Sequence, residues 1–211
     1  MPLSEFIDIT QPSFWLTVGS VAFNPTFWNI AARSEYHNKT ITRLFNGNSR
    51  NGCYALAVTI FSLGIIRDYI YHAALSHQPT HPLLLSPVAK LASLALLAAG
   101  NTLVLTSMYA LGVTGTYLGD YFGILMDHRV TSFPFSVTDA PMYVGSTLSF
   151  LGTALWYGKP AGVALTAFVW LAYSVALRYE DPFTAGIYER REVSRQQAAG
   201  KGESESGKKE L

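Results

Sequence analysis

The stretch LASLALLAAGNTLVLTSMYALGV, residues 91–113, contains no charged side chain. A helix needs about 20 predominantly apolar residues to cross the ~30 Å hydrocarbon core of a bilayer. A run of this length and composition therefore predicts a membrane-spanning helix, and it predicts that the chain that carries it lies in a membrane.

The overall composition agrees with a membrane location. Charged residues make up 14% of the 211 residues, against about 25% in a typical soluble domain. The length corresponds to one domain. A formal net charge of +1 provides no general attraction to nucleic acid, so we expect no nucleic-acid partner.

A second apolar run, residues 53–66, is short by itself. It reaches spanning length when it is extended to residues 51–72. The extension carries Arg67 and Asp68, which must lie near a membrane face or pair with each other.

A third run, residues 142–177, is too long for one crossing and is interrupted by Lys159 and Pro160. A lysine at the bilayer centre would cost about 2.5–3.5 kcal/mol, whereas proline suits the first turn of a new helix. We therefore expect a hairpin of two helices, 141–157 and 160–179.

The first run, residues 13–32, contains Asn24 and Pro25 near its middle. These residues interrupt the run, which leaves open a re-entrant or in-plane segment in place of a clean span. The predicted fold is an all-α integral membrane protein with four to five transmembrane or intramembrane helices and an interfacial C-terminal helix. We expect one domain, residues 1–198, and a disordered polar tail, residues 199–211; the membrane segments of the domain are 13–32, 51–72, 91–113, 141–157 and 160–179.

Basic residues predict the orientation. Segment 33–50 carries four of them against one acid, Glu35, and the C-terminal tail from residue 190 carries six more. The positive-inside rule puts both segments, and the C-terminus, in the cytosol. Five crossings satisfy this arrangement with the N-terminus outside. Four crossings are the alternative.

Two short signals bear on the compartment. Lys208 and Lys209 stand where a dilysine retrieval signal of an endoplasmic reticulum membrane protein would stand. The alternative interpretation of these lysines is a solvated charge run. A mitochondrial membrane is a further candidate location beside the endoplasmic reticulum. Asn38 begins the sequon NKT, and in a cytosolic loop this asparagine receives no glycan.

The cysteine and histidine content offers no metal site. Cys53 is the single cysteine and lies in an apolar run, so we expect a small buried or lipid-facing side chain. The five histidines form no helical pair with metal-ligand spacing. No metal is predicted, and the sequence carries no signal for an oligomeric state.

Segment 111–135 differs from its neighbours. Gly115, Gly119 and Gly123 stand four residues apart, which suits close packing of membrane helices, although glycines also let a backbone approach a ligand. The segment also holds four ionisable residues, for which solvated charges at the membrane interface are the simplest interpretation: Asp120, Asp127, His128 and Arg129.

Glu180 and Asp181 directly follow the last apolar run. Acids at a helix C-terminus face the negative end of the macrodipole, at a cost of about 0.3–1 kcal/mol each. Asp181 has a structural explanation, because it can cap a new helix from Pro182 to about Arg195. Glu180 has none, which favours a ligand-binding function.

Several strings occur together in order: FNPTFWNIAAR, YALGVTGTYLGDYFGI, RVTSFPF, DAPMYVGST and YEDPFTAGIY. In these strings the chain resembles the phosphatidylethanolamine N-methyltransferase family, over about residues 20–190. More distantly it resembles the isoprenylcysteine carboxyl methyltransferases. The resemblance implies S-adenosylmethionine as methyl donor and an ethanolamine phospholipid in the bilayer as acceptor.

The resemblance also implies a cofactor site of two elements. The family's Gly-x-Gly falls on Ala98, Ala99 and Gly100, with alanine in place of the leading glycine. The family's Glu-Glu pair falls on Glu180 and Asp181. Such carboxylates can accept hydrogen bonds from the ribose hydroxyls of the cofactor or hold its ammonium group.

The implied chemistry requires the acceptor amine to lose a proton, since an alkylammonium has a pKa of about 10. Five side chains are candidate bases, and the sequence does not choose among them: His128, Asp120, Asp127, Asp139 and Glu180. Three tyrosines are candidates for holding a methylated ammonium by cation–π contact, with an interfacial aromatic belt as the alternative: Tyr117, Tyr121 and Tyr143.

Other functions stay open at this point. One alternative is a non-catalytic multi-spanning membrane protein, and another is a methyltransferase for a different membrane-embedded substrate, such as isoprenylcysteine. A transporter would show repeats or paired broken helices, and the sequence shows no convincing repeat. The concentration of motifs on one predicted membrane face favours the enzyme.

Overall fold

The computed structural model describes residues 5–127 and 130–206 of the chain. Over these residues the chain is helical and contains no strand. Its elements are α1 (Pro12–Asn38), α2 (Thr40–Leu44), α3 (Ser49–Ser76), η2 (Pro82–Leu85), α4 (Pro87–Thr116), η3 (Gly119–Phe122), α5 (Pro141–Trp156) and α6 (Pro160–Ser206).

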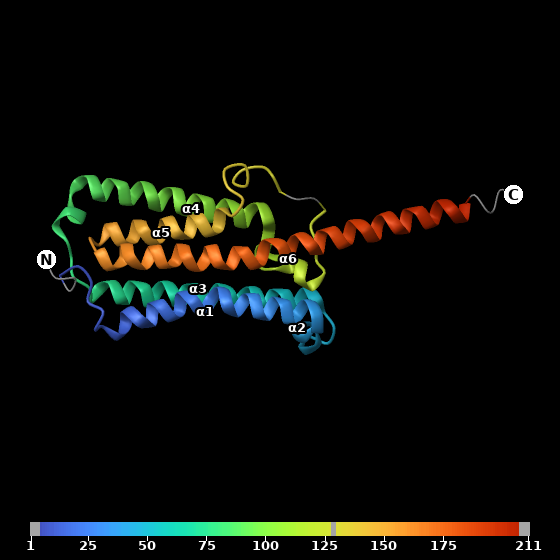
Figure 1. Ribbon diagram of the computed structural model, residues 1–211, viewed down its shortest axis with the longest axis horizontal. Coiled ribbons are helices and arrows are strands. Elements are labelled where there is room, and N and C mark those ends of the chain that lie inside the picture. The colour runs from blue at the N-terminus through green and yellow to red at the C-terminus, as the bar shows by residue number, and fades with distance from the viewer. Residues whose placement is uncertain (1–4, 128–129, 207–211) are drawn as a thin grey trace.

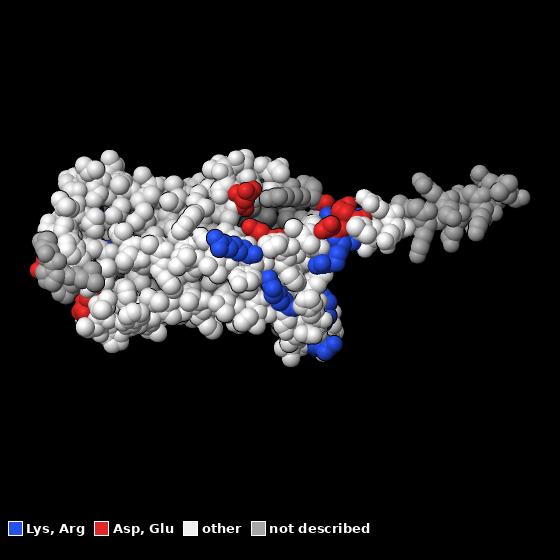
Figure 2. All heavy atoms as spheres, viewed as in Figure 1, with Lys and Arg blue, Asp and Glu red and all other residues white. Residues whose placement is uncertain are grey.

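Five long helices lie side by side along one axis and alternate in direction (Figure 1). One end of the bundle holds α2, η3 and the point where α6 leaves the bundle, and we call it the basic end. The opposite end holds residues 5–11, 77–86 and 157–159. Figure 2 shows Lys and Arg side chains gathered at the basic end; by sequence these include Arg33, Lys39, Arg43, Arg50, Arg178, Arg190 and Arg191.

Three helical stretches in the described chain are long and apolar enough to cross a membrane: Ser49–Ser76, Pro87–Phe122 and Pro160–Gln197. The bundle also exposes large apolar side chains along its sides, for example Val88 and Leu91. A soluble protein rarely presents such a surface. The predicted class, an all-α integral membrane protein, is confirmed.

The expected interruption of the first segment is not found. Helix α1 continues through Asn24 and Pro25 without a break, and both residues are buried. The Asn24 Nδ2 donates to the Leu63 carbonyl of α3 at 3.2 Å. The pair therefore contributes to packing between α1 and α3, and α1 runs the length of the bundle (Figure 1).

The predicted hairpin has its turn where the sequence puts it. Helix α5 ends at Trp156 and α6 begins at Pro160. The Lys159 Nζ donates to the Gln78 carbonyl at 2.7 Å at the opposite end, so its charge lies outside the bundle interior.

Helix α6 corrects another expectation, because no new helix begins at Pro182. The helix passes through Asp181 and Pro182 and continues to Ser206, and its last part projects beyond the bundle (Figure 1). The expected polar tail, residues 199–211, overlaps the end of α6. Lys208 and Lys209 lie outside the described residues.

Gly115, Gly119 and Gly123 do not line one face of a helix, as their spacing of four residues suggested. Helix α4 changes direction at Gly112, whose φ is 63°, and ends at Thr116, so Gly119 and Gly123 lie beyond it. A Cβ on Gly119 would lie 2.6 Å from the Thr114 carbonyl oxygen. These glycines allow a tight turn that folds η3 back onto the bundle.

Candidate functional site

Glu180 joins three helices at the basic end. Its Oε1 accepts hydrogen bonds from Trp28 Nε1 at 2.7 Å and from Asn29 Nδ2 at 2.6 Å, both on α1. Its Oε2 accepts one from the Tyr143 hydroxyl of α5, also at 2.6 Å. Because α6 continues past Glu180, this carboxylate is not at a helix C-terminus, and the expected unfavourable dipole does not apply.

The cluster keeps unused acceptor capacity. A carboxylate offers about four lone-pair sites, and three donors occupy Glu180. The Asn29 Oδ1 is buried and has no hydrogen-bond partner within the described structure. An unpaired buried acceptor beside a carboxylate fits a ligand that brings hydroxyl donors or a positive charge.

Asp120 of η3 belongs to the same cluster. Thr184 of α6 and the charge of Glu180 both lie close enough to act electrostatically on its carboxylate. Next to it, the buried Tyr121 stacks on Phe183 with ring centroids 5.1 Å apart. Stacking against α6 holds η3 in place, so two carboxylates from distant parts of the chain share one site.

The tyrosines occupy different environments. Tyr121 is 1% exposed, and the Tyr143 hydroxyl is used by Glu180, so neither forms an interfacial belt. Tyr117 presents its carbonyl to the Cys53 thiol at 3.7 Å. Cys53 itself is fully buried, which confirms one of its two expected environments.

The other predicted cofactor element lies elsewhere. Ala98 and Ala99 are exposed on α4. Gly100 is buried against α5, where an added Cβ would lie 2.5 Å from the Gly145 carbonyl oxygen. Within the described chain, the hydrogen bonds of Glu180 come from Trp28, Asn29 and Tyr143 and not from these three residues. The space at Gly100 is taken by the packing of α4 on α5.

The remaining candidates lie at the periphery. Asp127, Asp139 and Asp181 are exposed, and His128 lies outside the described residues. Arg191 of α6 holds the chain near Asp127 through the Met126 carbonyl at 2.6 Å. No group of three or more His, Cys, Asp or Glu within the described ranges could hold a metal ion.

Sequence reasoning gave no function to Trp28, Asn29 or Thr184. The first two belong to the string FNPTFWNIAAR, which marks the resemblance but does not reveal the contact. They meet Glu180 across 152 and 151 residues of chain. A local pattern carries no signal for such a contact.

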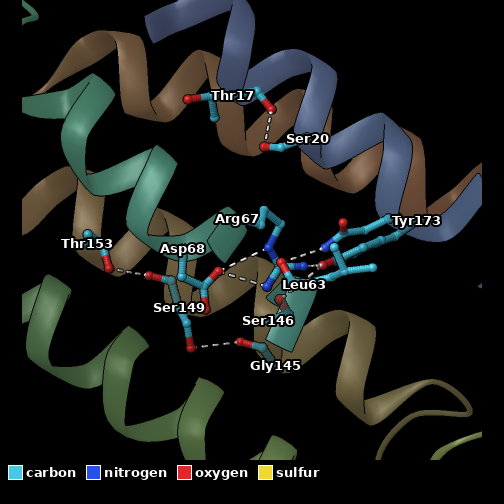
Figure 3. A network of polar contacts seen from close by, with 11 residues as sticks. Thr17, Ser20, Leu63, Arg67, Asp68, Gly145, Ser146, Ser149, Thr153 and Tyr173 are labelled. Carbon is cyan, nitrogen blue, oxygen red and sulfur yellow. Dashed lines mark hydrogen bonds and ion pairs between the residues drawn. The ribbon is translucent and has the colours of Figure 1, made fainter. Parts of the chain in front are cut away.

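A second polar network lies inside the bundle (Figure 3), and a ring contact joins it to the cluster. The Tyr143 ring packs on Tyr173 with centroids 4.8 Å apart. The Tyr173 hydroxyl accepts from Arg67 Nη1 and lies 3.2 Å from the Ser146 hydroxyl. The Arg67 Nη2 donates to Asp68 Oδ1 at 2.8 Å. Of the two arrangements expected for Arg67 and Asp68, a place near a membrane face or a pair, the structure therefore shows the pair.

The fold and the cluster define a class: an integral membrane helical bundle with an acceptor-rich polar site at one end. Residues 88–191 match the family model described as Phospholipid methyltransferase. The chain belongs to the phospholipid methyltransferase family, and it is an enzyme of that type.

Curated relatives cover nearly the whole chain. A phosphatidyl-N-methylethanolamine N-methyltransferase of Neurospora crassa is 58% identical over 99% of this chain and 95% of its own length. The protein of that name from Saccharomyces cerevisiae is 54% identical over 92% and 93%. A phosphatidylethanolamine N-methyltransferase of Rattus norvegicus is 48% identical over 90% and 94%. No solved structure matches the chain.

Proposed function

We propose that this enzyme transfers methyl groups from S-adenosylmethionine to the amine of ethanolamine phospholipids, with phosphatidyl-N-methylethanolamine as preferred acceptor and phosphatidylcholine as final product. The names of relatives that are 54% and 58% identical support this choice of acceptor. The observation that carries the proposal for the site is the Glu180 cluster with the unpaired Asn29 Oδ1.

Glu180 and Asp181 are the proposed cofactor-binding pair. S-adenosylmethionine supplies an electrophilic methyl group on a sulfonium centre. Glu180 and the Asn29 amide oxygen can accept from its ammonium or ribose hydroxyls, and Asp181 adds a second charge one residue further along α6. Trp28 and Tyr143 orient the Glu180 carboxylate for this purpose.

Asp120 is the proposed base. The acceptor reaches the site protonated, and its pKa of about 10 must be overcome before its lone pair is free. Asp120 is near enough to Glu180 and Thr184 to be influenced by both, whereas Asp127 and Asp139 are exposed. His128 is the alternative. The aromatic face of Tyr143 is the proposed contact for the methylated ammonium, since the ring of Tyr121 is buried against Phe183.

Ala98, Ala99 and Gly100 are the second proposed cofactor element. Gly100 also packs against Gly145 of α5, so a change at Gly100 can act on the site through α5. Cofactor affinity and Tm, measured together on Gly100 variants, separate a cofactor contact from a packing role.

For the location we propose the endoplasmic reticulum membrane, with the basic end and the C-terminus in the cytosol. The concentration of Lys and Arg at that end supports the orientation. At a site on the cytosolic face, the water-soluble methyl donor can reach the phospholipid acceptor that lies in the bilayer. A mitochondrial membrane is the alternative location.

The test is methyl transfer by the purified protein in lipid vesicles with labelled S-adenosylmethionine. Phosphatidylethanolamine and its monomethyl and dimethyl forms are supplied separately. We expect the fastest labelling with the monomethyl form. Equal rates for all three acceptors would contradict the preference, and no labelling of any would contradict the proposed function.

A further inference from the structure

Arg33 lies one helical turn beyond Asn29 on α1, beside the Glu180 cluster. Its Nη2 donates to the Tyr179 carbonyl at 2.8 Å. Its guanidinium lies 4.7 Å from the centroid of the Phe183 ring. Tyr179 and Phe183 stand on either side of Glu180 in α6, so Arg33 is a direct neighbour of the site.

The positive charge of Arg33 is not neutralised within the described structure, where no carboxylate lies within ion-pair distance of it. Glu35, the acid nearest in sequence, is fully buried and accepts from the backbone N–H groups of Ile41 at 2.6 Å and Thr42 at 3.0 Å. A guanidinium has five N–H donors, and one hydrogen bond from Arg33 is formed. The side chain is partly exposed.

We propose that Arg33 binds the phosphodiester of the acceptor phospholipid while the amine of the same head group lies at Asp120, beside the Glu180 cluster. This inference rests on the proposed function. In the head group an oxygen and an ethylene unit separate phosphorus from nitrogen. This short span is comparable to the ~5–6 Å between Cβ atoms of residues four apart on a helix, which is the relation of Arg33 to Asn29.

The charges of the site complement those of the head group. Asp120 faces a cationic amine, and Arg33 faces an anionic phosphate, which a guanidinium can bind through two parallel hydrogen bonds. Arg33 is also near the end of α1 that lies at the basic end, where the phosphates of one leaflet lie if that end is at the membrane surface. Arg33 would thereby select lipid amines that carry a phosphate.

The carboxylate of S-adenosylmethionine is an anion too, so the experiment must separate the two ligands. Arg33→Gln and Arg33→Lys are purified in detergent with Arg43→Gln as matched control. Arg43 is an exposed arginine of α2 at the same end of the bundle. The measurements are KM for phosphatidyl-N-methylethanolamine in mixed micelles, Kd for S-adenosylmethionine, Tm, and binding of short-chain phosphatidyl-N-methylethanolamine followed as a thermal shift.

For Arg33→Gln we expect the lipid KM to rise about 10–150-fold, as for a lost charge-assisted hydrogen bond, with the cofactor Kd within about twofold of the wild-type value. Arg33→Lys should recover part of the loss, because a lysine keeps the charge without the paired donors. Arg43→Gln should leave all the measured quantities unchanged.

An unchanged lipid KM in Arg33→Gln would overturn the inference, and so would a rise in the cofactor Kd alone. Parallel losses of lipid affinity, cofactor affinity and Tm would assign Arg33 a purely structural role and also overturn it. If the wild-type protein binds the short-chain lipid but transfers no methyl group, the proposed function fails. The thermal shift of Arg33→Gln then decides the phosphate contact separately.

Discussion

Gly100 of α4 and Gly145 of α5 approach so closely that neither has room for a side chain. A Cβ on Gly100 would lie 2.5 Å from the Gly145 carbonyl oxygen, and a Cβ on Gly145 would lie 2.6 Å from the Gly100 carbonyl oxygen. The obstacle on both sides is backbone, which cannot rotate away. Since α5 also carries Tyr143, this contact helps to set the position of the Tyr143 hydroxyl that donates to Glu180.

Gly100→Ala should therefore destabilise the protein by about 1–3 kcal/mol through overpacking. Thermal unfolding in detergent measures this. The control is Gly64→Ala on α3, where no atom lies within 4 Å of an added Cβ and where alanine should be neutral or stabilising by up to ~1 kcal/mol. If Gly100→Ala keeps the wild-type Tm and loses cofactor affinity, Gly100 acts on the ligand and the packing account is wrong.

Glu180→Gln should weaken S-adenosylmethionine binding about 10–150-fold. The neutral amide keeps an acceptor for Trp28 and Asn29 but offers Tyr143 a poorer partner, so some loss of Tm is expected as well. Asp181→Asn should weaken binding less, and Asp181→Glu should be nearly neutral. Wild-type affinity in Glu180→Gln, measured by calorimetry, would remove Glu180 from the cofactor site.

Tyr143→Phe removes the same hydroxyl contact with Glu180 but leaves the carboxylate charge and the ring packing on Tyr173. We expect a stability loss of about 1.5–3 kcal/mol, as for a hydrogen bond to a charged group. The loss of cofactor affinity should be smaller than in Glu180→Gln. Tyr109→Phe, at a residue that is 92% exposed, is the control and should unfold like the wild type. Equal affinity losses in Tyr143→Phe and Glu180→Gln would mean that Glu180 acts only through its helix contacts.

Arg67 and Tyr173 should be energetically coupled, because the guanidinium donates directly to the phenol oxygen. A double-mutant cycle of Arg67→Met and Tyr173→Phe, read by thermal unfolding, should give an interaction energy of about 0.5–3 kcal/mol. Arg67→Met alone should be the more harmful single change, since it also leaves Asp68 without its partner. Additive effects would show that the contact contributes nothing to stability.

The two ends of the bundle should lie on opposite sides of the membrane. Thr40 and Thr80 are exposed at the basic and opposite ends respectively. In a Cys53→Ala background, a membrane-impermeant maleimide should label Thr40→Cys in intact microsomes, and Thr80→Cys only after permeabilisation. Asn38 should carry no glycan. Labelling of Thr80→Cys in intact microsomes, or a glycan on Asn38, would contradict the five-crossing arrangement.

The helices of the bundle could be predicted because a bilayer imposes a direct length and hydropathy requirement on the sequence. Residues 91–113 fall inside α4. The start of α6 at Pro160 could be predicted because Lys159 is costly inside a bilayer and proline suits the first turn of a helix. The breaks expected at Pro25 and Pro182 are wrong for one shared reason. Proline sets a local preference, and neighbouring helices can compensate for the backbone group that it leaves unpaired.

The site could be predicted only in part. Glu180 stands out in sequence as an acid after an apolar run, although the dipole cost expected at that point does not arise because α6 is unbroken. Trp28 and Asn29 could not be assigned, because their contact with Glu180 depends on how α1 packs against α6. Asp120 was one of several equal candidates until the turn after Gly112 brought η3 to Thr184.

The unbroken α6 fixes how deep the site lies. Glu180 follows Pro160 by twenty residues in one continuous helix, about 30 Å at 1.5 Å per residue. This equals the ~30 Å hydrocarbon thickness of a typical bilayer. A thinner bilayer would lift the carboxylate into the head groups, and a thicker one would draw it into the acyl chains or tilt the helix, at fractions of a kcal/mol per Å of mismatch. If Glu180 belongs to the active site as proposed, we expect acyl-chain length in the surrounding lipid to influence the rate of methylation, independent of how much acceptor is present.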